Sequence, residues 1–547
     1  MFCHGTGFWI HALLAVLTAA LLVPAASAGV VESWVARFDG DASFRDGGRD
    51  IVAHPAGGCF VVGTVSKDGS SDDCCVTIRY AADGESLWVR HYDADTSRDW
   101  GRAIELYPSG GVVVAGTSHI LYCTNNTFVA RYDEGGLLVW DERPTLGYPQ
   151  DVGGLAVSES GETYVACRDN TCGYIVTKYE PDGDEAWCSL EDYSTEPKDI
   201  TVDSDGCAYV TGEWGCPLKS QRYGGQCGTV KYRSGGSIAW TETENYRKGK
   251  AVAVDGMGNV YVGGFRDYSS WDFCTIKYDS TGSHLWEAIY DGPDGSNDTV
   301  QDLALDGSGN VYVVGDSYGS ETDMDWALVK YDSEGNEQWA RRYDGPGSGQ
   351  DWPRDMEVTE AGDVFIVGSA EQQDGDTDLA MRKYDRLGNL LWTATYDGPG
   401  GGYDEGYAVA LAPDGAIYVT GRSVGLGTDQ DLVVIRYDEN DTAVEPIPDI
   451  VDRTALALYP PEPNPTRGDC QVHLFLPAEA GPVRLRVCDV AGRIVRTLID
   501  RQSVSPGPAS ATWDGRDREG HAVGSGVYFL VLEVASQSVS QKLVLLR

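Results

Sequence analysis

The sequence is poor in basic side chains and in methionine. Its 547 residues include 42 Lys and Arg against 84 Asp and Glu, which gives a formal net charge of −42. Such an excess of negative charge repels phosphate backbones and anionic membrane surfaces, so it argues against nucleic acid or lipid headgroups as partners. Only 5 methionines stand against 68 glycines. Because the apolar residues also show no 3.6-residue period, short strands and turns are favoured over helices.

Long apolar stretches are also scarce. The one extended run, residues 12–23, is too short to span a bilayer and is followed by Pro24 and the small residues 26–28. This order is typical of a secretory signal peptide cleaved after Ala28, although no Lys or Arg precedes the run. No later stretch approaches eighteen apolar residues. The sequence therefore predicts a signal peptide over residues 1–28 and a secreted, extracellular or cell-surface protein without a transmembrane segment.

A repeat dominates the rest of the chain. Tryptophan recurs at spacings of 46 to 54 residues, at positions 34, 88, 140, 187, 240, 286, 339 and 392. Each interval holds an alternating strand such as residues 251–255, a glycine turn, a second strand such as 260–264, and a third such as 274–279. A basic residue followed by Tyr closes the third strand eight times, from Arg79-Tyr80 to Arg436-Tyr437. Tandem units of four short strands are typical of a β-propeller.

Counting the strands predicts an all-β fold with an eight-bladed propeller over residues 29–441. The eighth set of three strands ends at Tyr437, and no tryptophan strand follows it. Trp34 instead precedes the first set, so residues 33–40 are predicted to complete the last blade and close the ring. Seven blades is the alternative, if the third unit, with its short loop between Cys167 and Cys172, is not a full blade.

The repeat resembles that of the bacterial secreted propeller-repeat family. The matching segments read GNVYVVG (309–315) and ALVKYDSEGN (327–336), and the resemblance extends over residues 33–438. It implies a propeller fold. It implies no activity, because that family is defined by its repeat rather than by a reaction.

The composition changes after the last repeat. Residues 442–455 are predicted to be a linker, and residues 456–547 carry 10 basic and 9 acidic side chains, so nearly all of the negative charge belongs to the propeller. The terminal segment resembles the Ig-like domain of flagellar hook-capping type and the sorting domains of type IX secretion substrates. The residues that match are Asp489, Gly492, Arg493, Trp513, Asp514, Gly515, Gly526, Tyr528 and Lys542. The resemblance implies a small β-sandwich that export machinery recognises or that attaches the protein to a surface. A passive terminal module is the alternative.

Ligand-binding residues are expected on the face of the ring that carries the long loops. An aspartate recurs there just before the innermost strand, at Asp46, Asp99, Asp298, Asp351 and Asp404. Such a ring of carboxylates would attract cations such as Ca²⁺ or cationic ligands. Trp100 and Trp352 follow two of them and could stack on a sugar. The alternative is that each aspartate accepts hydrogen bonds from loop amides and fixes a turn.

The cysteines of the sequence include two pairs that could form disulfides. Cys3 leaves with the signal peptide, so 13 of 14 cysteines remain, an odd number. Cys167 with Cys172, and Cys216 with Cys227, bracket loops and could close hairpins as disulfides.

Two features resemble those of eight-bladed quinoprotein dehydrogenases. One is the adjacent pair Cys74 and Cys75, and the other is the Asp-x-x-Gly-x-x-x-Trp run at 279–286, 332–339 and 385–392. Without an identifiable set of ligands for quinone and Ca²⁺, quinoprotein chemistry is disfavoured and no cofactor is expected.

Two classes of function remain. The favoured one is a non-enzymatic binding or scaffold protein, in which the propeller holds an unknown protein or glycan ligand and the C-terminal domain serves export or attachment. The alternative is a carbohydrate-active hydrolase or lyase. Such an enzyme needs two carboxylates about 5–10 Å apart in a cleft, one of them with a raised pKa.

Overall fold

The computed structural model describes residues 29–439 and 457–545. Within these ranges it leaves out residues 41–45, 68–71, 93–97, 121–123, 147–148, 170–172, 192–194, 215–225, 246, 268–269, 321, 348, 459–469, 477–482, 490–492, 502–506 and 535–536. The predicted signal peptide (1–28) and linker (442–455) lie outside the described residues. Strands make up the regular structure of the described residues, and none of those residues belongs to a helix that could cross a membrane.

Each predicted repeat forms one four-stranded antiparallel sheet. The first four sheets contain β2 (Gly47–Ala53), β3 (Cys59–Lys67), β4 (Asp72–Tyr80) and β5 (Ser86–Tyr92); β6 (Arg98–Leu106), β7 (Val112–Ile120), β8 (Thr124–Tyr132) and β9 (Leu138–Glu142); β10 (Pro149–Val157), β11 (Thr163–Asp169), β12 (Tyr174–Tyr179) and β13 (Glu185–Glu191); β14 (Thr195–Val202), β15 (Ala208–Trp214), β16 (Gln226–Tyr232) and β17 (Ile238–Asn245). The third repeat, whose completeness the sequence left open, thus has all four strands.

The remaining repeats follow the same order. Three sheets contain β18 (Arg247–Val254), β19 (Val260–Asp267), β20 (Trp271–Tyr278) and β21 (His284–Tyr290); β22 (Asp298–Leu305), β23 (Val311–Tyr318), β24 (Met324–Tyr331) and β25 (Glu337–Tyr343); β26 (Trp352–Val358), β27 (Val364–Glu371), β28 (Thr377–Tyr384) and β29 (Leu390–Tyr396). The last sheet contains β30 (Glu405–Leu411), β31 (Ile417–Val424), β32 (Gln430–Glu439) and, from the start of the chain, β1 (Val30–Phe38).

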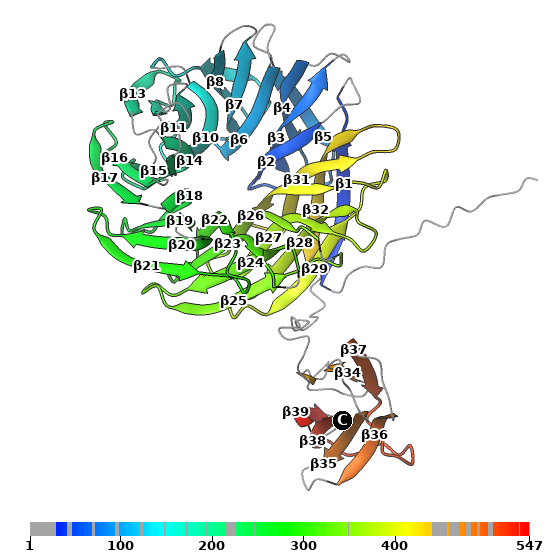
Figure 1. Ribbon diagram of the computed structural model, residues 1–547. Coiled ribbons are helices and arrows are strands. Elements are labelled where there is room, and N and C mark those ends of the chain that lie inside the picture. The colour runs from blue at the N-terminus through cyan, green and yellow to red at the C-terminus, as the bar shows by residue number, and fades with distance from the viewer. Residues whose placement is uncertain are drawn as a thin grey trace, which may run out of the picture.

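The N-terminal strand joins the last sheet, as the sequence predicts. β1 pairs antiparallel with β32, with Val30 opposite Glu439 and Phe38 opposite Leu432. The strand begins three residues earlier and ends two residues earlier than the predicted 33–40. In Figure 1 the dark blue β1 lies beside the yellow β31 and β32 and closes the circle of sheets.

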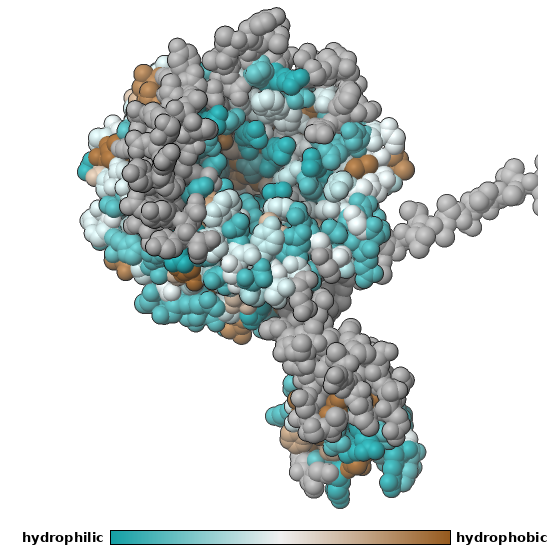
Figure 2. Space-filling view, in the orientation of Figure 1, coloured by the Kyte–Doolittle hydropathy of each residue, from teal (hydrophilic) through white to brown (hydrophobic). Residues whose placement is uncertain are grey.

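The first strand of each sheet lies on the inside of the circle of sheets (Figure 1), and the space-filling view shows a hollow at its centre (Figure 2). Each first strand packs against the first strand of the next sheet, from β2 through β6, β10, β14, β18, β22 and β26 to β30, and β30 packs against β2. The second and third strands are apolar on both faces because a neighbouring sheet covers each side. Val61 and Val62 of β3 are both fully buried, for example.

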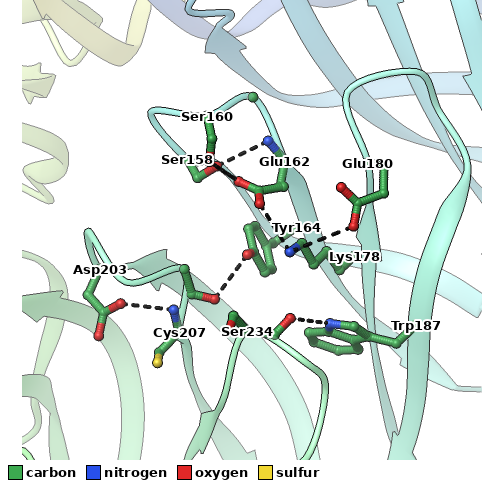
Figure 3. Close-up of polar contacts among 12 residues, drawn as sticks. Ser158, Ser160, Glu162, Tyr164, Lys178, Glu180, Trp187, Asp203, Cys207 and Ser234 are labelled. Atoms are coloured by element: carbon green, nitrogen blue, oxygen red, sulfur yellow. Dashed lines mark hydrogen bonds and ion pairs between the residues drawn. The ribbon is translucent and has the colours of Figure 1, made fainter.

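A tryptophan side chain connects the outer edge of each sheet to the next sheet. The Trp187 indole N–H donates to the Ser234 carbonyl of the following sheet at 3.0 Å (Figure 3). The ring covers Gly236, which has φ +85° and whose added Cβ would lie 2.7 Å from the indole, so only glycine fits. Close by, the Tyr164 hydroxyl donates to the Gly206 carbonyl at 3.0 Å, again across two sheets. The tryptophan ring therefore packs between two neighbouring sheets and bonds to the last turn of the second one.

The C-terminal region has its own core. It consists of β33 (Ala457–Leu458), β34 (Cys470–Leu476) and β37 (Gly507–Trp513) in one sheet, and β36 (Ile494–Arg501), β35 (Val483–Asp489), β38 (Gly526–Val534) and β39 (Gln537–Leu545) in the other. Trp513 is fully buried between them and contacts Leu485, Leu530 and Leu543 within one apolar cluster. Two antiparallel sheets around such a core form a small sandwich.

Candidate functional site

The five predicted aspartates are buried rather than exposed at a channel mouth. Asp46, Asp99, Asp298, Asp351 and Asp404 are each at most 1% exposed. Asp404 accepts hydrogen bonds from the backbone N–H groups of Gly398 (2.8 Å) and Val424 (3.0 Å). Asp46 and Asp351 make the equivalent pairs of bonds. Each aspartate therefore fixes the loops at the entry to its own first strand.

The five aspartates do not gather into one ring. Instead, three of them each lie close to two carboxylates of the preceding sheet. The groups are Asp298 with Asp272 and Asp291, Asp351 with Asp325 and Asp344, and Asp404 with Asp378 and Asp397. Burial raises the pKa of Asp351, and the charges of Asp344 and Asp325 add to the rise, which reaches about 7.

The two predicted stacking residues are half-buried. The Trp100 indole N–H donates to Asp73 Oδ2 at 2.8 Å, and its ring stacks on His119. The guanidinium of Arg354 lies 5.6 Å from the centre of the Trp352 ring. Both rings therefore have partners within the protein already.

The predicted disulfides fall partly outside the described residues. Cys167 is a free, fully buried thiol in β11, while Cys172 and Cys216 lie outside the described residues, as does the side chain of Cys227. Cys74 and Cys75, both buried in β4, likewise remain thiols, and burial raises the pKa of Cys75 well above its usual value.

The central hollow presents charged residues that the sequence did not single out. In the first strand of every sheet of the ring, the pairing with the second strand shifts by one residue; in β10 the extra residue is Gly153, and in the other seven strands it carries a side chain. Gly48 lies opposite Gly63 and Asp50 opposite Val62, for instance, so Arg49 is the extra residue of a bulge. The extra residues of the seven strands are Arg49, Arg102, Lys198, Lys250, Gln301, Arg354 and Tyr407. We call the five basic ones the basic rim.

Side chains of the basic rim interact with one another around the hollow. The Arg49 guanidinium lies 4.8 Å from the centre of the Tyr407 ring. The protein atoms around the hollow desolvate Arg102 in part although solvent reaches its side chain; this lowers its pKa, and the charge of the nearby Arg49 lowers it further. Arg49 and Arg102 are exposed, whereas the other three members are half-buried. Figure 2 shows the face hollowed at the centre of the ring, with hydrophilic residues around the opening.

Carboxylates form a second layer, one to three residues further along the first strands. Asp50 accepts hydrogen bonds from the Ile51 N–H and, in the next sheet, from the Ile104 N–H, both at 2.8 Å. Three further aspartates bridge first strands in the same way, with bonds of 2.8–3.1 Å: Asp199, Asp302 and Asp355. These four residues, with Glu105 and Glu357, make up what we call the acidic layer.

Members of the acidic layer raise one another's pKa across the hollow. Burial raises the pKa of Glu105 most, and the charges of Asp50, Asp199 and Glu357 add to it, to about 8. Burial and then the charges of Asp302 and Asp50 raise the pKa of Glu357 to about 7. Because the six residues come from five first strands, this mutual influence places them around one shared space.

The hollow therefore presents five basic side chains, of which Lys198 pairs with Glu196 at 3.3 Å, beside a layer of carboxylates with raised pKa. Five basic side chains in a ring can bind carboxylate or sulfate groups, and arginine does so with two parallel hydrogen bonds. The signal in the sequence was the residue just before the recurring Asp or Ala of the first strand, as in R-D-I (49–51), K-D-I (198–200) and K-A-V (250–252). It was missed because the bulge that turns this residue toward the axis is a feature of strand register, which alternation does not reveal.

Two family models match the chain. Residues 292–321 match a beta-propeller repeat, and residues 465–538 match the FlgD Ig-like domain. The chain thus carries a propeller repeat followed by an Ig-like domain, and both resemblances found in the sequence are confirmed. No curated protein matches the chain.

Several solved structures are similar in fold. Sqt1 from Chaetomium thermophilum is 12% identical over 75% of this chain and 100% of its own, with a TM-score of 0.45. A Dyadobacter fermentans protein is 10% identical over 75% of this chain and 100% of its own (TM-score 0.38). PorZ, a surface component of the type-IX secretion system of Porphyromonas gingivalis, is 13% identical over 91% of this chain and 81% of its own (TM-score 0.27).

Proposed function

We propose that the chain is a secreted or cell-surface, non-enzymatic binding protein whose ligand is a short acidic glycan held at the basic rim. In this proposal residues 29–441 form one propeller of eight blades, residues 442–455 link it to the Ig-like domain, and that domain serves export or surface attachment. The signal-peptide pattern of residues 1–28 and the Ig-like match at 465–538 support the extracellular assignment.

The observation that carries the proposal is the repeated bulge. A rigid ring of strands places Arg49, Arg102, Lys198, Lys250 and Arg354 at equivalent positions around one opening. These basic residues stand out in a chain of net charge −42. That overall charge repels long polyanions, so a short carboxylated or sulfated oligosaccharide is the better fit. Tyr407, beside Arg49, and Trp352, beside Arg354, add aromatic edges at the opening, since an arginine already lies over each ring.

A binding experiment tests the proposal. The full chain would be screened against short neutral, uronic-acid and sulfated oligosaccharides, and its affinity for the best binder measured by titration calorimetry. Changing both Arg102 and Arg354 to Gln should weaken binding of an acidic oligosaccharide about 10- to 100-fold, because each charged hydrogen bond contributes about 1.5–3 kcal/mol and water replaces part of it.

The control variant is Arg233→Gln. Arg233 is exposed in the short turn between β16 and β17, at the end of its sheet that lies away from the long loops. The variant should bind like the unchanged protein. Failure of every acidic oligosaccharide to bind would refute the glycan assignment, and equal binding of neutral and acidic sugars would refute the role of the basic rim. Binding of an acidic peptide alone would identify a protein ligand instead.

The acidic layer supports a second candidate function, a carbohydrate-active hydrolase or lyase. Glu105, with its pKa raised to about 8, would remain protonated near neutral pH and could donate a proton, while a second carboxylate such as Glu357 would act as base. Chromogenic glycosides and uronic-acid polymers test it. Turnover that Glu105→Gln abolishes would favour the enzyme, whereas binding without turnover would favour the binding protein.

A further inference from the structure

Three groups of aspartates recur where one sheet leads into the next. Each group takes one residue from a third strand, one from the end of the following fourth strand and one from the entry to the next first strand. The groups are Asp272, Asp291 and Asp298; Asp325, Asp344 and Asp351; and Asp378, Asp397 and Asp404. Equivalent members are 53 residues apart. We call these groups the aspartate triads.

The spacing within a triad suits one cation. In every triad, one ligand oxygen from each residue lies within 4.8 Å of the other two. Ca²⁺ binds oxygen at about 2.3–2.6 Å, so two ligands on opposite sides of the ion are about 4.6–5.2 Å apart. Three oxygens of a triad can therefore contact one Ca²⁺ without a change in backbone position. Water or loop carbonyls would supply the remaining ligands of such an ion.

The second triad contains a buried oxygen that receives no hydrogen bond. Asp325 is 4% exposed, and its Oδ2 accepts bonds from Arg342 (2.7 Å) and Thr322 (2.9 Å), while its Oδ1 has no partner among the described residues. In the first triad Asp298 is 1% exposed, and its carboxylate accepts bonds from the Gly292 N–H and from the Ser317 hydroxyl. Buried anionic oxygens without a partner are costly, and a bound cation removes that cost.

The third triad gathers the most negative charge. Besides Asp378, Asp397 and Asp404, whose ligand oxygens lie within 4.8 Å of one another, Asp374 and Asp376 belong to the loop that leads into β28. In the second triad Arg342 offsets part of the charge, but the equivalent position here is Thr395. Such a concentration of like charges in one place is stable when a cation lies among them.

We propose that the aspartate triads bind Ca²⁺ and that each ion joins two consecutive sheets. Two of the three ligands come from one sheet, for example Asp378 of β28 and Asp397 after β29, and the third, Asp404, from the entry to the next sheet. The ion therefore links neighbours at the loop face, away from the tryptophans of the outer rim. This site is independent of glycan binding at the basic rim.

Calorimetry on the full chain tests the proposal. After removal of metal with EDTA, CaCl₂ would be titrated into the protein, and thermal unfolding would be compared in 5 mM CaCl₂ and in EDTA. Extracellular Ca²⁺ modules bind with dissociation constants of about 10⁻⁴–10⁻³ M, so 5 mM Ca²⁺ should raise the unfolding temperature by about 5 °C.

Asp378→Asn is the diagnostic variant. Asparagine keeps the shape of the side chain and removes its charge, so in EDTA the variant should unfold at the same temperature or higher. In Ca²⁺ it should bind one ion fewer than the unchanged protein and lose about a third of the Ca²⁺-dependent rise. The matched control is Asp205→Asn, an exposed aspartate in the turn between β14 and β15, which should retain the full response.

Three outcomes overturn the proposal. The first is the absence of binding heat and of any shift in unfolding temperature up to 5 mM Ca²⁺. The second is an Asp378→Asn variant that keeps the original stoichiometry. The third is an equal response to 5 mM Mg²⁺, because Mg²⁺ needs oxygens about 4.0–4.2 Å apart across the ion and an equal response would indicate screening by any divalent cation.

Discussion

Neighbouring sheets are joined differently at the outer rim and at the inner rim. Outside, the repeat tryptophans of all eight sheets donate an indole N–H to the following sheet, seven of them to a carbonyl of its last turn. Inside, a carboxylate bridges to the next first strand at four sheets only, through Asp50, Asp199, Asp302 and Asp355. The outer contact is the same uncharged hydrogen bond at seven of the eight sheets, whereas the inner one is charged and variable.

This difference indicates that the outer contacts maintain the ring, whereas the residue at the inner position varies from sheet to sheet. At the inner position, Ala103, Ala251 and Ala408 replace the aspartate, and the ring still closes. The outer position holds tryptophan without exception, even at the junction with the last sheet, where Trp392 of β29 donates to the Glu439 side chain and covers Gly29 in place of a turn. Variation at the inner rim is what a ligand-binding surface requires.

The largest effect is expected from removal of the closing strand. Deleting residues 30–38 leaves β32 with an unpaired edge and removes Trp34 from its contact with Ala82. We expect loss of a single cooperative unfolding transition and aggregation, measured by calorimetry and light scattering. A deletion variant that melts like the full chain would show that the inner contacts alone can maintain the ring.

A tryptophan of the outer rim should matter next. Trp88 is 9% exposed, and its indole N–H donates to the Glu134 carbonyl at 2.9 Å. Trp88→Ala should lower the free energy of unfolding by about 3–5 kcal/mol, because a large buried ring leaves a cavity. Denaturant unfolding measures the loss. Trp271→Ala, at a tryptophan that is 37% exposed and outside the repeat position, should cost about 1 kcal/mol or less. Equal losses would contradict a special role for the outer rim.

An inner bridge should contribute less. Asp50→Ala leaves the Ile104 N–H without its acceptor, so the free energy of unfolding at pH 7 should fall by about 1–3 kcal/mol. Val252→Ala in β18, a small apolar truncation that leaves the Asp199 bridge to its own N–H in place, serves as a reference for packing loss alone. If Asp50→Ala changes stability by less than about 0.5 kcal/mol, the inner carboxylates do not help to hold the sheets together.

The smallest effect should depend on pH. The pKa of Glu105 is about 8 in the folded protein and near 4.5 when unfolded, so folding favours the protonated carboxyl. Its contribution is fully present below pH 4.5 and is lost as the pH rises to 8. Glu105→Gln should therefore leave stability unchanged at pH 4.5 and raise it by about 1–2 kcal/mol at pH 8, since water screens the half-buried side chain.

Thermal unfolding at both pH values measures the effect of Glu105→Gln. The control is Glu159→Gln, at an exposed glutamate in the turn between β10 and β11, which should show no difference between pH 4.5 and pH 8. A stabilisation by Glu105→Gln that is equal at both pH values would mean that charge at the inner rim is not its cause.

The fold could be predicted from the sequence because its strongest signals are local and repeated. Trp and the glycine turn define each outer contact, and the pairing of β1 with β32 followed from a missing strand at one end and a surplus strand at the other. The domain order was likewise evident from the change in charge after Tyr437.

The candidate site was harder to predict because it depends on register and on contacts between repeats. Asp99 and Asp404 were identified by their recurrence, but whether a carboxylate faces the hollow or the loops depends on which amides lie nearby in space. Arg49 and Arg354 were missed because a one-residue bulge decides where they point. The aspartate triads require three segments from two sheets, which no single stretch of sequence brings together.

The pairing of β1 with β32 also sets an order of events during biosynthesis. The Ser33 hydroxyl donates to Asp438, 405 positions further along the chain, so the first strand of the ring cannot pair until the last strand of the ring has been synthesised. Contacts of such long range form slowly, and an unpaired strand can meanwhile pair with another chain. A ribosome that stops early would therefore release a product with two open edges, which a chaperone or protease can recognise as incomplete.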